Sequence, residues 1–119
     1  MATLGATLPR AEQALDVLAT ARTNNRTQSL TFRVPAHQSR VSELRIRSGS
    51  LAITLVGLEI AFRDGGTERF VLQGALAPGH QSQPIPVDPS RTIREVLVTK
   101  QPGLRPGETA IQLLGKVQP

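Results

Sequence analysis

At 119 residues the chain is long enough for one domain with a hydrophobic core, and the absence of cysteine excludes disulfides and thiol chemistry. Its net charge of +5 comes from twelve arginines and two lysines against nine acidic residues, which favours solubility and weak attraction to polyanions. Three Phe with no Trp or Tyr leave few aromatic faces, which argues against proteins that bind nucleic acids or sugars by stacking.

The start of the chain is expected to be a flexible leader over residues 1–13, ahead of a single domain over residues 14–119. Met1 and the residues after it lack the basic and then apolar layout of a signal peptide, and no apolar run is long enough to span a membrane. A signal peptide removed before this start would leave the same sequence. The sequence therefore leaves the compartment open.

The segment Ala14–Arg22 fits two local structures. Pro9 shortly ahead of it and apolar residues at helical spacing suggest a short N-terminal helix. Alternation of Leu15, Val17 and Ala19 suggests a strand. The strands expected downstream favour the strand, because tertiary context overrides a weak helix propensity.

Alternating apolar residues predict further short strands along the chain. These lie at residues 30–34, around Leu44 and Ile46, at Ile93–Lys100 and at Thr109–Val117. Ile85 and Val87 also alternate, but among three prolines. Proline lacks the N–H that a central ladder needs, so this strand is expected at a sheet edge.

The clearest signal is the stretch Leu51–Leu76, which predicts two apolar strands joined by a tight turn. A three-residue loop Asp64–Gly66 keeps the apolar residues of both arms on one face and sets Ile60 opposite Phe70. Such a loop is a type I turn closed by a glycine with positive φ.

The apolar phase changes within the first arm of this hairpin, between Leu55 and Leu58. One extra residue must be absorbed near Val56–Gly57, and a β-bulge does this. We expect the bend to make the hairpin a hinge between two sheets.

Seven to nine short strands at roughly ten-residue spacing, with turn residues between them, are typical of a β-sandwich. The predicted fold is therefore all-β, an antiparallel and jelly-roll-like sandwich.

Several short motifs follow one another between Val41 and Gly115. They are the strand VSELRIRSG, an aromatic-x-Asp-Gly turn at 62–65, Gly-x-x-Ser at 79–82, Ile-x-Val at 85–87, Arg-x-Ile-x-x-Val at 91–96 and a final strand ending in glycine. This order resembles a family of small bacterial β-sandwich domains of uncharacterised function, which are often exported. The resemblance implies a sandwich and periplasmic or extracellular location after signal removal, and it brings no catalytic residue.

Catalytic and metal-binding patterns are weak. His37 and His80 lie in separate loops without neighbouring acids, whereas a metal site needs about three or four ligands. His80, Ser82 and Asp88 are close in sequence but lack the Gly-x-Ser-x-Gly pattern of a nucleophile turn. We therefore expect no enzyme activity, no metal and no cofactor.

Five arginines take the phase opposite to the core and form the candidate anion-binding set: Arg33, Arg45, Arg47, Arg63 and Arg69. On a shared sheet face they would attract nucleic acid, acidic polysaccharide or an anionic membrane surface. The alternative is a solvated face rich in arginine. Arg91 precedes a strand, and we expect a structural role for it, paired with Asp88 or with loop carbonyls.

The favoured function is a non-enzymatic module that binds or assembles with another protein or itself, through an exposed edge such as Ile85–Val87. An anion-binding domain that uses the outward arginines is the alternative. A hydrolase around His80 and Ser82 comes third.

Overall fold

A computed structural model describes residues 15–103 and 107–118, the side chain of Gln73 apart. The leader expected over residues 1–13 lies outside this part. Among the described residues no helix is long and apolar enough to cross a membrane. The elements are β1 (Asp16–Asn24), β2 (Ser29–Arg33), the 3-10 helix η1 (Ala36–Gln38), β3 (Val41–Arg47), β4 (Ile53–Phe62), β5 (Thr67–Leu76), β6 (Ile85–Pro86), β7 (Ile93–Lys100) and β8 (Glu108–Val117).

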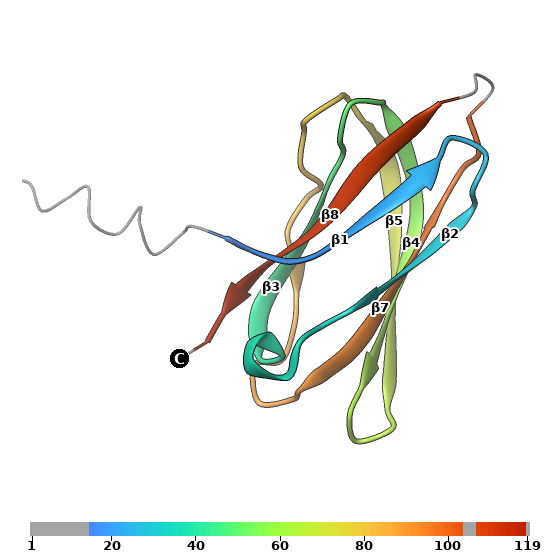
Figure 1. Cartoon of the computed structure of the whole chain (residues 1–119). Coiled ribbons are helices and arrows are strands. Elements are labelled where there is room, and N and C mark those ends of the chain that lie inside the picture. The colour runs from blue at the N-terminus through green and yellow to red at the C-terminus, as the bar shows by residue number, and fades with distance from the viewer. Residues whose placement is uncertain (1–14, 104–106, 119) are drawn as a thin grey trace, which may run out of the picture.

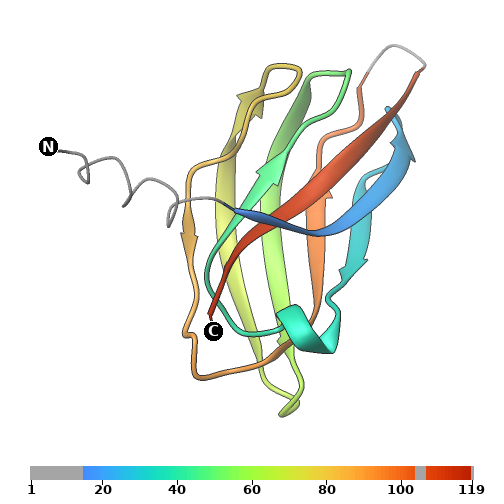
Figure 2. The same cartoon turned by 60° about the vertical axis from the view of Figure 1, so that its left-hand side comes forward.

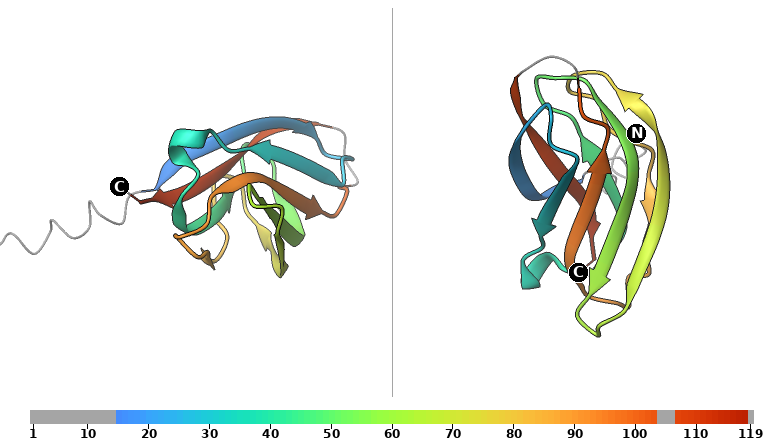
Figure 3. Two further views of the ribbon diagram at one scale, coloured as in Figure 1. Left: turned by 90° about the horizontal axis from the view of Figure 1, so that it is seen from below. Right: turned by 90° about the vertical axis from the view of Figure 1, so that its right-hand side faces the viewer.

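The strands form two four-stranded antiparallel sheets, β1-β8-β3-β6 and β2-β7-β4-β5, which pack face to face (Figure 1, Figure 3). The pairs β1·β8, β2·β7, β3·β6 and β4·β5 are nested around the β4–β5 turn, like a long antiparallel ribbon that has been rolled up. The β3–β8 and β4–β7 pairings close the roll. This is the strand order of an eight-stranded jelly roll, and the predicted all-β sandwich is confirmed.

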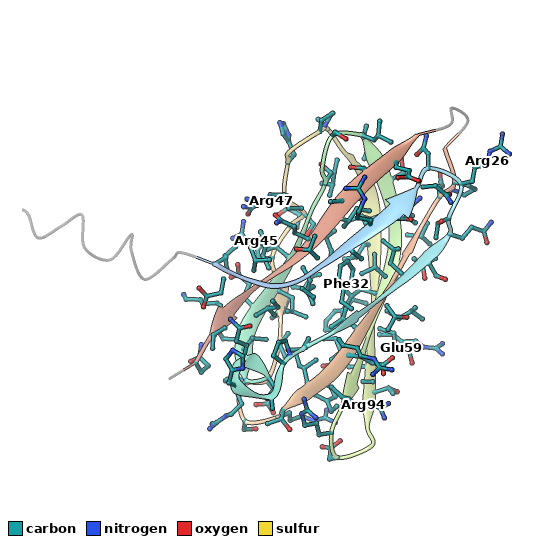
Figure 4. The ribbon with its side chains drawn as sticks, viewed as in Figure 1. Arg26, Phe32, Arg45, Arg47, Glu59 and Arg94 are labelled. Carbon is teal, nitrogen blue, oxygen red and sulfur yellow. The ribbon has the colours of Figure 1, made fainter. Side chains whose placement is uncertain are left out.

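The core lies between the sheets and consists of the inward residues of each strand. Phe32 of β2 and Phe62 of β4 are the largest fully buried side chains, and Figure 4 shows Phe32 between the layers. Phe70 of β5 is half-buried and packs against the same core. All three Phe therefore pack in or against the core.

The β4–β5 turn has the predicted form but not the predicted position. The loop is Arg63–Gly65, with φ of 94° at Gly65, and the Phe62 N–H donates to the Gly66 carbonyl at 2.9 Å. Ile60 consequently faces Glu68, so the expected loop at residues 64–66 and the Ile60–Phe70 pairing were wrong. Alternation fixes only which residues share a face, and both registers satisfy it; the register depends on which glycine takes positive φ.

The one-residue slip at Val56–Gly57 is confirmed. The register of β4 shifts between Leu55 and Gly57 against both β5 and β7, and Val56 is 42% exposed. The expected hinge between sheets was wrong, because both halves of β4 pair with β5 in one sheet. A bulge bends and twists a strand within its own sheet, and the chain changes sheets in the turn after β3 instead.

The ambiguous N-terminal segment is a strand, as favoured, but its phase differs from the prediction. Leu18 is buried, whereas Val17 is 44% exposed. The β1–β8 register shifts between Val17 and Ala19, and this irregularity turns Leu18 inward.

Candidate functional site

The structure divides four of the five candidate arginines between the two sheets and places Arg63 in the β4–β5 turn. Arg45 and Arg47 lie on β3, while Arg33 and Arg69 lie on β2 and β5 of the other sheet. Figure 4 shows Arg45 and Arg47 on the side away from Glu59 and Arg94. These arginines therefore do not share one sheet face. The alternation of apolar residues shows that a side chain points outward, but it does not show to which of the two sheets its strand belongs.

Most of these arginines already have partners. Arg45 Nε donates to Glu43 at 2.7 Å, and the Arg47 guanidinium donates to the Gln112 side-chain oxygen. Arg69 lies 3.6 Å from Glu59, and Arg63 donates to the Val34 carbonyl at 3.2 Å. The positive charge is thus locally offset at several positions, and anion binding stays a prediction.

Arg91 ties the β4–β5 turn to the segment before β7. Its guanidinium lies 3.2 Å from Asp64 and 3.7 Å from the centre of the Phe62 ring. The expected partner Asp88 instead accepts bonds from Ser90. The Gly66 N–H and then Arg91 hold the pKa of Asp64 below its ordinary value. Arg91 therefore joins two loops at one end of the sandwich.

Two of the three residues of the weak triad pattern, Ser82 and Asp88, make hydrogen bonds with other groups. Ser82 is buried; its hydroxyl accepts the Ile46 N–H at 2.9 Å and donates to the Gln83 carbonyl at 3.1 Å. His80 and Asp88 are exposed. Among the described residues no three His, Asp or Glu side chains gather as metal ligands do. The Ser82 hydroxyl thus accepts the hydrogen bond from the Ile46 N–H of β3 that a backbone carbonyl of a neighbouring strand would otherwise accept.

Lys100 is a buried cation at the end of β7. It is 2% exposed, and its ammonium donates to the Asn25 carbonyl at 3.4 Å. Among the described residues no carboxylate pairs with it in an ion pair. Burial lowers the pKa of Lys100 from its ordinary value of 10.5.

We expect Lys100→Met to raise stability at neutral pH by up to about 1 kcal/mol, because a buried charge gives way to an apolar chain. The lowered pKa means that the unfolded state binds more protons, so the parent protein gains stability as the pH rises towards 10.5. The variant should lose that gain. Urea unfolding at about pH 7 and about pH 10 measures both effects.

Lys116→Met is the matched control, since the chain has no other lysine and no Tyr or Cys to titrate in this range. An unchanged pH slope in Lys100→Met would contradict the assignment.

The edge suggested from the sequence is poorly suited to binding. Ile85 and Val87 are buried, and β6 has only two residues. The edge strand β5 is different: it has ten residues and pairs only with β4 (Figure 2). Its Val71 is 82% exposed. The sequence did contain this signal, as an apolar residue in the polar phase of the second hairpin arm.

A shallow apolar groove adjoins Val71 on the outer face of the sheet. Gly57 pairs with Val71 on one side and Thr99 on the other, so no side chain stands between these two residues. The groove has a volume of about 360 Å³. Val56 and Leu97 also line it. A second groove, of about 460 Å³, runs between β5 and residues 80–83, over Leu55, Leu72 and Leu76.

These features make the free edge of β5 and its two flanking grooves the candidate site, called the β5 edge below. The apolar side chains at its surface could pack against a partner, while alternate backbone groups could pair with an added strand.

No protein-family model matches the sequence, and no curated protein matches it. The family resemblance seen in the sequence therefore stays a prediction. The chain is similar to part of a protein in the structure of infectious bursal disease virus Gx strain, at 15% identity and a TM-score of 0.42 over 86% of this chain and 30% of that one.

Two further solved structures are similar at the same low level. The C-terminal domain of a structural protein from sulfolobus turreted icosahedral virus has 19% identity and a TM-score of 0.42, covering 86% of this chain and 100% of that one. A family 29 carbohydrate binding module from Piromyces equi has 10% identity and a TM-score of 0.41, covering 86% and 91%. The jelly-roll assignment rests on the strand order of the chain itself.

Proposed function

We propose that this protein is a non-enzymatic module that joins another polypeptide along the β5 edge. One observation carries the proposal: Val71 is 82% exposed in the middle of a ten-residue edge strand. Scattered exposed apolar residues are common, but this one lines a groove in the sheet face together with Val56 and Leu97.

The other edges of the two sheets are less open to strand addition. The β6 edge is two residues long and is flanked by prolines, which lack the N–H that pairing needs. The β1 edge has an irregularity between Val17 and Ala19, and β2 has only five residues. Proteins protect edges with such features. The β4–β5 register also shifts, between Leu55 and Gly57, but β5 has ten residues and is the longest of the four edge strands.

The non-enzymatic part of the proposal is supported by Ser82. A nucleophile needs a hydroxyl that is free to attack and a base beside it. The Ser82 hydroxyl is buried and bonded to the backbone of β3 and of its own loop.

The test uses a fluorescein-labelled peptide with the sequence of residues 67–76 as an extended probe. We expect it to bind the folded protein, and Val71→Arg in the protein to weaken binding about tenfold or more. Val17→Arg is the matched control, since Val17 is an exposed valine on the other sheet. Fluorescence anisotropy reports the binding.

A scrambled peptide should not bind. If the ordered peptide binds no better than the scrambled one, or if both arginine variants weaken binding equally, the β5 edge is not the binding site.

A further inference from the structure

Taking the proposed function as given, we propose that the partner at the β5 edge is a second copy of this chain. The two β5 strands pair in antiparallel fashion, with Val71 of one copy opposite Val71 of the other. The two four-stranded sheets then continue into one sheet across a two-fold axis.

The backbone of β5 is oriented for this pairing. Phe62 exchanges bonds with the turn at Gly65 and Gly66, so Phe62 directs its backbone groups towards β5. Alternate residues of a strand direct their backbone N–H and C=O groups towards the same neighbouring strand. The backbone groups of Ile60 and of Glu68, which lies opposite it, therefore point towards each other. In the continuous register from Thr67 to Val71, the odd-numbered residues, Val71 among them, therefore point their N–H and C=O groups away from the sheet.

The sequence of β5 is self-complementary around Val71. Residues 69–73 read Arg-Phe-Val-Leu-Gln, which is polar, apolar, apolar, apolar, polar in either direction. With Val71 on the axis, Phe70 of each copy stands opposite Leu72 of the other. Arg69 stands opposite the uncharged Gln73. Apolar residues meet on both faces of the joined sheet, and no like charges face each other.

Neighbouring symmetric registers are less favourable. An axis through Arg69 sets two arginines opposite each other, which is destabilising. An axis through Phe70 sets Arg69 opposite Val71, and an axis through Leu72 sets Val71 opposite Gln73. The charge and apolar pattern together select Val71.

The contact also covers surface that the single chain leaves open. Val71 is 82% exposed, and Phe70 and Leu72 are only partly buried against the core. A strand-to-strand contact is smaller than a standard protein interface, so we expect a dissociation constant in the micromolar range. Each copy carries a net charge of +5, so added salt should strengthen the dimer by screening repulsion.

The first measurement is light scattering with size exclusion over a wide range of protein concentrations. We expect a concentration-dependent dimer that Val71→Arg abolishes and Val17→Arg leaves unchanged. Circular dichroism checks that both variants are folded, as expected for exposed positions.

The second measurement determines the register by disulfide cross-linking of single introduced cysteines. The chain itself contains no cysteine, so no other thiol competes. Paired residues of a hydrogen-bonded antiparallel pair have Cα atoms about 5.5 Å apart, within the range for a disulfide. Val71→Cys should therefore form a disulfide-linked dimer on mild oxidation. Val56→Cys and Val17→Cys, at exposed positions away from the axis, should cross-link much more slowly.

A strict monomer at every concentration overturns the proposal, as does cross-linking of all three cysteine variants at the same rate. A dimer that survives Val71→Arg also overturns it, because another face then makes the contact. If the chain is monomeric while the labelled peptide still binds, the second copy is the wrong partner and the binding module stands. If neither dimer nor peptide binding is found, both proposals fail.

Discussion

Replacing Phe32 with alanine is expected to lower the free energy of unfolding by about 3–5 kcal/mol. Phe32 is 1% exposed and lies between the two sheets, where the loss of its ring leaves a cavity that neighbours on both layers border. The β-sheets cannot close this space without breaking ladder bonds, so the cavity cost adds to the lost burial. Urea unfolding followed by far-UV circular dichroism measures the change.

Circular dichroism is the suitable signal because the chain has no Trp or Tyr. Phe32→Leu keeps much of the volume and should cost less than half as much, and Val17→Ala at an exposed position should change stability by about 0.5 kcal/mol or less. A loss in Phe32→Ala no larger than that in Val17→Ala would show that the space between the sheets is not tightly packed.

Gly49→Ala is expected to cost about 1–3 kcal/mol, although it adds a single methyl group. Gly49 lies where the chain crosses from β3 to β4, and a Cβ atom there would overlap the Ala110 carbonyl and the Thr109 hydroxyl of β8. The carbonyl belongs to a strand held between two neighbours, so it cannot move aside cheaply. The Ser50 N–H also donates to the Thr109 hydroxyl, and the overlap disturbs that bond.

Thermal unfolding of Gly49→Ala beside Gly57→Ala measures the effect. A Cβ at Gly57 would meet only the Phe70 carbonyl, at 3.3 Å, and the site opens onto the sheet face, so this control should be nearly neutral. Equal losses in both variants would mean that a general property of glycine in strands, and not the contact with β8, is responsible.

Much of the fold could be predicted from the sequence because one physical signal, the alternation of apolar residues, is strong. It places β7 at Ile93–Lys100 with no error at either end, and it locates the slip at Val56. The same alternation cannot distinguish strand registers that differ by two residues. A loop one residue earlier moves the register by two, which keeps every side chain on its face, so the sequence could not choose between Arg63–Gly65 and its neighbour.

The candidate site was harder to predict because it depends on which strands become neighbours. Phase showed that Arg45 and Arg69 point outward, but only the rolled topology puts them on opposite faces. In the same way, Val71 in the polar phase is unremarkable until β5 is known to be an edge. The strand at Ile85–Val87 does lie at a sheet edge, as predicted, but it is only two residues long and its apolar residues turn inward, which the sequence did not reveal.

The nested strand order also has a consequence for how the protein is made. β8, the last of the described strands to be synthesised, lies between β1 and β3 in its sheet. While a ribosome is still making residues 108–117, that sheet lacks its middle strand, and the edges of β1 and β3 stay open to other chains. Asp16 meets Gly115 only at the end, so closure depends on contacts between distant parts of the chain. Such topologies fold slowly, in about milliseconds to seconds, and the unfinished chain is the state most exposed to aggregation.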